Sequence, residues 1–144
     1  MIAGAPIQIV IDTNVFISAI TNNTGASFYL FSLVGKKHFE INISVPLILE
    51  YESVATRRLS QTNLNENDLS HILDYLCLAA NKHDIDYLWR PFLNDPKDDF
   101  VLELAVKSNS QFIITFNKKD FIGLSRFGIQ ALTPWEFLNI RGFI

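Results

Sequence analysis

Three carboxylate side chains of this chain lie near predicted junctions between strands and helices. Asp12 directly follows the apolar run 7–11. Glu50 lies near the start of the helix that follows the apolar run 39–43, and Asp98 lies in the first turn of a later helix. In open parallel α/β sheets, ligands bind in the crevice beyond the carboxyl ends of the strands. A cluster of carboxylates there, without a matching cationic motif, favours a divalent metal ion.

Asp12 and Glu50 also have ordinary structural explanations. An aspartate between a strand and a helix often acts only as the N-cap of the helix. Glu50 and Glu52 share one helix, and the helical periodicity does not choose between them. The position of Glu50 closer to the helix start favours it, because that end of the helix joins the strand terminus.

The acidic segment 95–99 predicts both a helix start and a candidate ligand. Asp95 can cap the helix, with Pro96 in its first turn. Asp98 falls on the apolar face of this helix, and a carboxylate there is costly to bury unless it is paired or bound to metal. The apolar face also contains Val101, Leu102 and Ala105, and the opposite stripe contains Asp99, Glu103 and Lys107.

Asn117 and Asp120 follow another apolar run, 112–115, again at a predicted carboxyl end. Both residue types are common in turns. Either one is equally well placed to bind a metal ion directly or through water, and the residues alone leave these alternatives open.

Strands that alternate with helices predict a three-layer α/β/α sandwich with a mainly parallel central sheet, formed as a single domain by residues 1–144. The expected strands are 7–11, 39–43, 85–89, 112–115 and 129–132. The expected helices are 15–20, 26–36, 46–59, 67–80, 98–108 and one that begins near 134.

Composition narrows the class of protein further. Hydrophobic residues make up 49% of the chain, as in a globular protein with a large core, and the net charge of −3 disfavours a strongly basic nucleic-acid-binding domain. The single cysteine, Cys77, excludes an intramolecular disulfide. Neither a membrane-spanning run nor a secretory signal is present, which favours the cytoplasm. Pairs of basic residues such as Lys118 and Lys119 are either solvated surface or a track for phosphates.

Four segments of the sequence, in order, resemble the motifs of the PIN-domain family of nucleases. They are 9–15 (IVIDTNV), 43–51 (ISVPLILEY), 95–99 with 102–105 (DPKDD, LELA) and 113–117 with 119–121 (IITFN, KDF). The resemblance places the family glutamate on Glu50 and the central aspartate on Asp98. Many members have aspartate where this chain has Asn117, although toxin members often have asparagine there, so Asp120 remains an alternative fourth residue.

The resemblance implies a Mg²⁺- or Mn²⁺-dependent endoribonuclease that cuts single-stranded RNA. Asp12, Glu50 and Asp98 are then the expected metal ligands, with Asn117 or Asp120 assisting, and the ion orients and acidifies the attacking water. The residues expected to hydrogen-bond to these ligands or to water are Thr13, Asn14, Ser44 and Thr115. Small bacterial members are commonly toxins held inactive by an antitoxin protein, and a homodimer remains an option.

Two other functions compete with the nuclease hypothesis. A PIN scaffold with a silent site would bind RNA or a protein partner without cleaving anything, and the neutral amide of Asn117 leaves room for it. A haloacid-dehalogenase-like phosphatase also has an aspartate after its first strand. That chemistry needs a second aspartate two residues later, where this chain has Asn14.

Overall fold

A sheet of five parallel strands forms the centre of the computed structural model, which describes residues 5–144 except 85–95, and the side chains of 96–99 also lie outside the described part. The strand order is β3-β2-β1-β4-β5. The strands are β1 Ile7–Ile11, β2 Phe39–Ile43, β3 Asn81–Lys82, β4 Phe112–Ile114 and β5 Gln130–Leu132.

Strand β1 occupies the middle of the sheet, with β2 on one side and β4 on the other. Ile9 is paired in register with Ile41 of β2 and with Phe112 of β4. The three residues at the end of β1 are fully buried, as expected for a central strand of a sheet covered on both faces. The register therefore brings the carboxyl ends of β2, β1 and β4 to one edge of the sheet.

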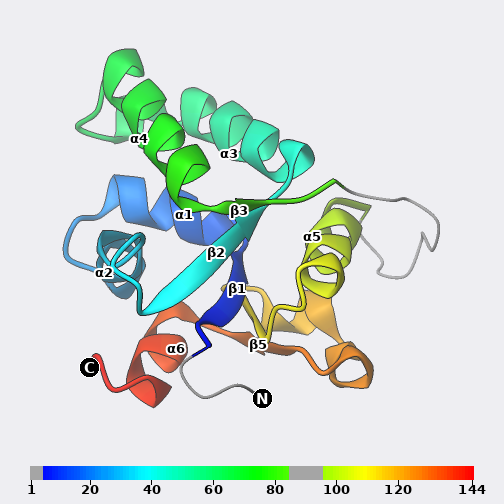
Figure 1. Cartoon of the computed structure of the whole chain (residues 1–144). Coiled ribbons are helices and arrows are strands. Elements are labelled where there is room, and N and C mark those ends of the chain that lie inside the picture. The colour runs from blue at the N-terminus through cyan, green and yellow to red at the C-terminus, as the bar shows by residue number, and fades with distance from the viewer. Residues whose placement is uncertain (1–4, 85–95) are drawn as a thin grey trace.

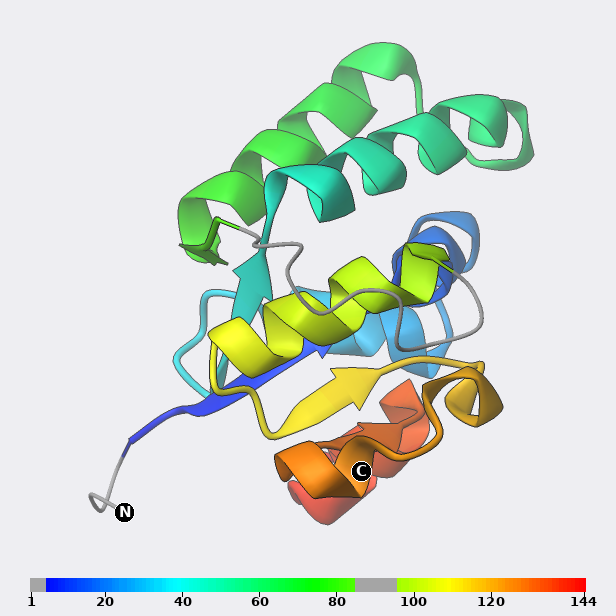
Figure 2. The same ribbon diagram turned by 90° about the vertical axis from the view of Figure 1, so that its right-hand side faces the viewer.

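Six helices surround this sheet in the described part of the chain. They are α1 Thr13–Thr21, α2 Ala26–Ser32, α3 Val45–Arg57, α4 Glu66–Ala79, α5 Pro96–Lys107 and α6 Pro134–Ile140. Helix α5 covers one face of the sheet, whereas α1, α2 and α6 cover the other, and α3 and α4 pack as a pair beyond β2 (Figures 1 and 2). This arrangement confirms the predicted α/β/α sandwich, with a sheet whose described strands are all parallel.

Capping residues set several helix boundaries near the predicted positions. The Ser44 hydroxyl accepts a hydrogen bond from the backbone N–H of Leu47 at the start of α3. Thr133 and Glu136 form a reciprocal capping box at the start of α6. Such caps satisfy backbone donors that have no partner inside the helix.

Two expected elements differ from the structure. The helix expected at 26–36 ends at Ser32, because the chain turns through Gly35, whose φ of 83° is easily adopted only by glycine. The strand expected at 85–89 lies outside the described residues. Instead, the short exposed strand Asn81–Lys82 pairs with β2, and its two residues show no apolar pattern that would have predicted it. Among the described helices, none has the length and apolar character needed to cross a membrane.

Candidate functional site

Asp12 lies at the carboxyl end of the central strand β1, and its carboxylate is held by two hydrogen bonds. The backbone N–H of Thr13 donates to Oδ1 over 2.9 Å, and the Thr115 hydroxyl donates to Oδ2 over 2.8 Å. Only 8% of the Asp12 surface is exposed, and Thr115 is completely buried. Each carboxylate oxygen therefore has a fixed direction and still has lone pairs for a ligand.

Glu50 is brought to the same place by Thr13, the first residue of α1. The Thr13 hydroxyl donates a hydrogen bond to Oε1 of Glu50, while its backbone N–H contacts Asp12. Glu50 is half-buried, whereas Glu52 on the same helix is exposed. Thus Thr13 links the carboxylate of its neighbour Asp12 to that of Glu50, which lies 37 positions after Thr13 in the sequence.

The surroundings of Asp12 disfavour its negative charge. Burial raises the pKa of the Asp12 carboxyl, and the nearby charges of Glu50 and Asp120 raise it further. The hydrogen bonds from Thr115 and from the Thr13 backbone act in the opposite direction but do not outweigh burial. A cation at this edge would remove the electrostatic cost, which is the pattern expected of a metal-binding carboxylate.

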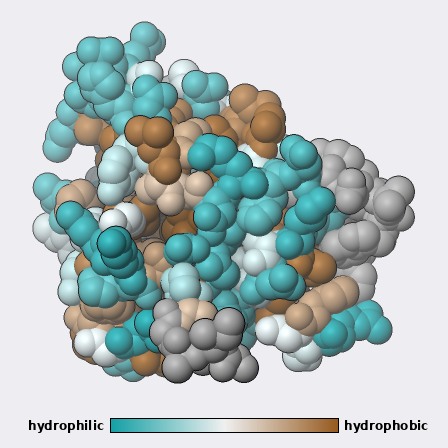
Figure 3. All heavy atoms as spheres, viewed as in Figure 1, coloured by the Kyte–Doolittle hydropathy of each residue, from teal (hydrophilic) through white to brown (hydrophobic). Residues whose placement is uncertain are grey.

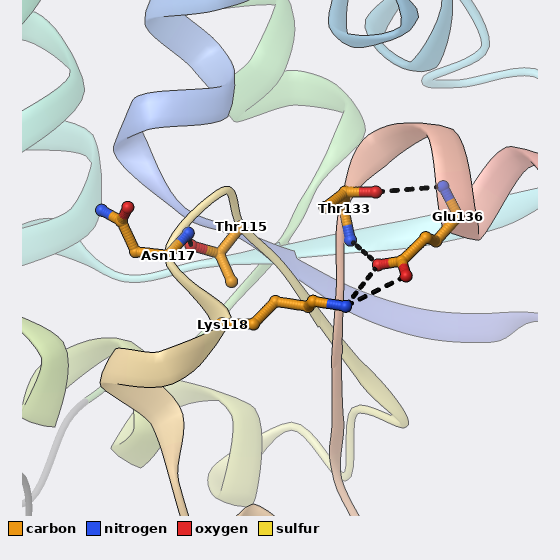
Figure 4. A network of polar contacts seen from close by, with 5 residues as sticks. All are labelled: Thr115, Asn117, Lys118, Thr133 and Glu136. Carbon is orange, nitrogen blue, oxygen red and sulfur yellow. Dashed lines mark hydrogen bonds and ion pairs between the residues drawn. The ribbon is translucent and has the colours of Figure 1, made fainter.

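Asn117 and Asp120 lie on the loop that follows β4. The backbone N–H of Asn117 donates to the Thr115 hydroxyl over 3.0 Å, so this loop is tied to the residue that holds Asp12 (Figure 4). Asp120 is exposed, on a short 3-10 helix, and is close enough to Asp12 to raise its pKa. Both residues therefore border the Asp12 site.

Lys118 forms an ion pair that joins the segment after β4 to helix α6. Its Nζ lies 2.9 Å and 3.0 Å from the two carboxylate oxygens of Glu136 at the start of α6 (Figure 4). Because Glu136 also caps α6, this pair fastens the loop after β4 to the helix after β5.

Asn14 and Ser44 were expected to hydrogen-bond to the metal ligands or to water. Asn14 accepts a long hydrogen bond of 3.4 Å from the backbone N–H of Phe116, which joins α1 to the loop after β4. Ser44 is buried, and its hydroxyl accepts the hydrogen bond that caps α3. Both residues support the edge of the sheet.

Tyr51 is a buried residue beside the site that sequence reasoning missed. Its hydroxyl donates a hydrogen bond to the carbonyl oxygen of Ile11, the residue before Asp12. Its ring stacks on Phe16 of α1, with centroids 4.6 Å apart and an interplanar angle of 13°. Burial raises the pKa of the Tyr51 phenol, and the charges of Asp12 and Glu50 add to this effect, so the hydroxyl stays protonated as a donor.

Replacing Tyr51 by phenylalanine should lower the free energy of unfolding by about 1–3 kcal/mol, because the buried carbonyl of Ile11 loses its hydrogen-bond donor. Urea denaturation followed by circular dichroism measures this loss. Tyr75→Phe is the matched control, since the Tyr75 hydroxyl also donates to a backbone carbonyl, that of Val34, but the residue is 49% exposed. An equal loss in the two variants would contradict the special position of Tyr51.

Asp98 was expected to supply the third carboxylate. Helix α5 connects two parallel strands and therefore runs back along them, which places its first turn at the carboxyl edge of the sheet. The Asp98 side chain itself lies outside the described part of the chain. Within the described residues, no group of three histidine, cysteine, aspartate or glutamate side chains is arranged to hold a metal ion.

Glu103 on α5 corrects one expectation. The sequence pattern assigned it to an exposed polar stripe with Lys107, yet only 3% of Glu103 is exposed. Helix α5 is covered by the sheet on one side and contacts α3 and the 3-10 helix Lys118–Phe121 elsewhere, so a broad part of its surface is buried. The chain thus buries a carboxylate on the helix that begins at the site.

A cavity of about 680 Å³ lies between α1, α2 and α4, away from these carboxylates. It is lined at the C-terminal end of α1 by Ala19 and Ile20, whereas Asp12 adjoins the opposite end of that helix. Hydrophobic side chains gather between α4 and the α1–α2 segment in Figure 3. Because its lining holds no carboxylate, this cavity does not share the chemistry of the Asp12 site.

The profile of the family described as the PIN domain matches residues 8–119, well over half of the chain. The chain therefore belongs to the PIN domain family, as predicted.

Among solved structures, a chain in the crystal structure of VapBC2 from Rickettsia felis bound to a DNA fragment from their promoter has a similar fold. The TM-score is 0.59 at 16% sequence identity, and the match covers 88% of this chain and 98% of that chain. At this identity the likeness concerns the fold. No curated protein matches the chain.

Proposed function

We propose that this protein is a metal-dependent endoribonuclease that hydrolyses phosphodiester bonds in single-stranded RNA. The observation that carries the proposal is the contact of Thr13 with both Asp12 and Glu50 at the carboxyl end of the central strand. Membership of the PIN domain family supports the same chemistry, because the family resemblance implies a nuclease.

The donor groups at this edge fit Mg²⁺ or Mn²⁺. Asp12, Glu50 and the expected Asp98 offer carboxylate oxygens, which hard divalent cations prefer. Asp12 is buried near two other carboxylates, so its charge lacks a compensating cation among the contacts that determine its pKa. When bound, the ion supplies a Lewis acid that activates water and offsets charge on the scissile phosphate.

The chain's own residues prepare this site. Asp12, Glu50 and Asp98 would hold the cation, and Asn117 or Asp120 would complete the edge. Thr115 and the Thr13 backbone fix the two oxygens of Asp12, while the Thr13 hydroxyl fixes Glu50. Hydrogen bonds of this kind orient ligands before the metal arrives, and losing one typically costs about 10–100-fold in metal affinity or activity.

Cleavage of a labelled single-stranded RNA by the purified chain tests the proposal. We expect cleavage with Mg²⁺ or Mn²⁺, loss of cleavage with EDTA and recovery when the metal is restored. The variant Asp98→Asn should not cleave the RNA even with the metal present, because it lacks one of the proposed metal ligands. Cleavage that persists in EDTA would contradict the proposed chemistry. A chain that binds neither metal by calorimetry would instead be the silent scaffold that Asn117 leaves open.

The biological role we propose is that of the toxin in a toxin–antitoxin pair, acting in the cytoplasm and neutralised by an antitoxin protein. The family match and the fold shared with a chain of the VapBC2 complex support this role. A short reading frame beside the gene should encode the antitoxin. Expression of the chain alone should arrest growth, and co-expression of that neighbour should relieve the arrest. Growth arrest that is unchanged by the neighbour would favour an RNA-processing nuclease.

A further inference from the structure

A hollow of about 280 Å³ lies beside the Asp12 site, at the carboxyl ends of β2 and β3. Its walls come from the end of β2, the first turns of α3, the end of α4 and the residues after β3. Because β1 and β3 are separated by one strand, the hollow begins within about 10 Å of the strand end that carries Asp12. The hollow therefore lies at the same edge of the sheet as the Asp12 site.

The lining of this hollow combines an apolar interior with a polar rim. Ile43 is buried, and Cys77 and Ile48 are partly buried. Val45 and Leu49 form an exposed apolar lip, with 69% and 56% of their surfaces accessible. Figure 3 shows hydrophobic side chains over the first turns of α3 in this region. Exposed apolar side chains beside a small hollow can pack against the face of a flat ring.

Three consecutive residues supply the polar rim: Lys82, which ends β3, and the two that follow it, His83 and Asp84. The His83 ring is anchored, because its Nε2 lies 2.8 Å from Oδ1 of Asn42, a residue that is 1% exposed. The Asn42 amide group donates to the Ile9 carbonyl and to Gln8, so Nε2 of His83 is the donor to Oδ1. Lys82 offers a donor and Asp84 an acceptor at the same rim.

From this arrangement we propose that the hollow binds one unpaired nucleobase of the RNA strand, next to the phosphate at the Asp12 site. This inference rests on the proposed nuclease function. Proteins recognise single-stranded RNA by packing against base faces and hydrogen-bonding base edges, and the hollow offers groups for both. Its volume lies below the ~300–1,000 Å³ of pockets for drug-sized ligands, so it suits one ring system.

The position next to the carboxylates favours RNA over a protein segment as the occupant. A protein chain that covered Val45 and Leu49 would approach the charges of Glu50 and Asp12 and remove water from them, which is costly. An RNA strand positioned by the metal site already passes this edge. Lys82 at the rim then attracts the adjoining phosphate.

Cys77 is the single cysteine of the chain and lines the hollow, so its alkylation reports on occupancy. The experiment uses Asp12→Asn protein, to prevent cleavage, and a short mixed-sequence single-stranded RNA at ten times its measured Kd. The rate of iodoacetamide alkylation, followed by mass spectrometry, should fall about tenfold. An abasic ribose-phosphate strand of the same length and at the same occupancy should protect much less.

The second test fills the hollow with a larger side chain and measures the kinetics of RNA cleavage. Cys77→Phe should raise KM for RNA cleavage about tenfold, the effect of losing one stacked base, with kcat little changed. Leu78→Phe is the control, because Leu78 is the next residue on α4 but is 83% exposed and outside the hollow.

The outcomes separate this inference from the proposed function. If the wild-type chain cleaves RNA but RNA leaves Cys77 unprotected, or the abasic strand protects equally, the base-binding site is wrong. Protection that instead rises with protein concentration in the absence of RNA would assign the hollow to a second copy of the chain and overturn the inference. Absence of cleavage by the wild-type chain would contradict the proposed function itself.

Discussion

Asp12→Asn should reduce kcat/KM for RNA cleavage by more than about 100-fold, because a direct metal ligand matters more than the hydrogen-bond partners whose loss costs 10–100-fold. Asparagine keeps the size of the side chain and an oxygen that can accept from the Thr13 backbone. The Thr115 hydroxyl can accept from the new amide group, so the fold should persist. The measurement is steady-state cleavage at saturating Mg²⁺, together with calorimetric titration of the metal.

The same substitution should stabilise the metal-free protein at neutral pH. The pKa of Asp12 is raised in the folded state by burial and by its acidic neighbours, so the folded protein holds this proton more tightly than the unfolded chain. Below the ordinary pKa of an aspartate, near 4, both states are protonated and Asp12 has no effect. As the pH rises through the raised folded pKa, the wild type loses stability, and the neutral asparagine avoids that loss.

Thermal unfolding in the presence of EDTA measures whether Asp12→Asn raises or lowers the stability of the metal-free protein. The Tm of Asp12→Asn should exceed that of the wild type at pH 7, and the difference should shrink toward pH 3.5. Added Mg²⁺ should raise the Tm of the wild type but not of the variant, because a ligand stabilises only a folded state that binds it. A variant that is less stable than the wild type at pH 7 would show that Asp12 has a mainly structural role.

The sequence predicts those site residues whose positions are determined by the ends of strands. Asp12 directly follows a buried strand, and Glu50 lies in the second turn of the helix that begins after β2. In a parallel sheet these ends share one edge, so their proximity follows from topology. For the same reason, the alternation of strands and helices was sufficient to predict the α/β/α fold.

The supporting contacts could not be predicted, because they depend on side-chain packing between distant segments. Tyr51 reads as an ordinary core residue of a helix, and its partner is a backbone carbonyl 40 positions earlier in the chain. Glu103 lies between Leu102 and Leu104, and its burial follows from the number of elements that pack around α5. Periodicity describes one face of a helix and does not reveal how many faces are covered.

Glu50→Gln should reduce kcat/KM by more than about tenfold and raise the Mg²⁺ concentration needed for half-maximal rate, because one negative charge is removed from the cation site. Glutamine retains an oxygen that accepts from the Thr13 hydroxyl, so the link between α1 and α3 persists. Glu52→Gln is a matched control on the same helix, since Glu52 is exposed, and it should leave the rate within about twofold.

Glu50→Gln should also change Asp12 itself. The charge of Glu50 contributes to the raised pKa of Asp12, so its removal should lower that pKa in the metal-free protein. Carboxyl titration by NMR would detect the shift in Glu50→Gln and its absence in Glu52→Gln. If both variants cleave like the wild type and leave the Asp12 titration unchanged, the two carboxylates do not act together. The hydrogen bonds from Thr13 would then serve only to begin helix α1 and fasten it to α3.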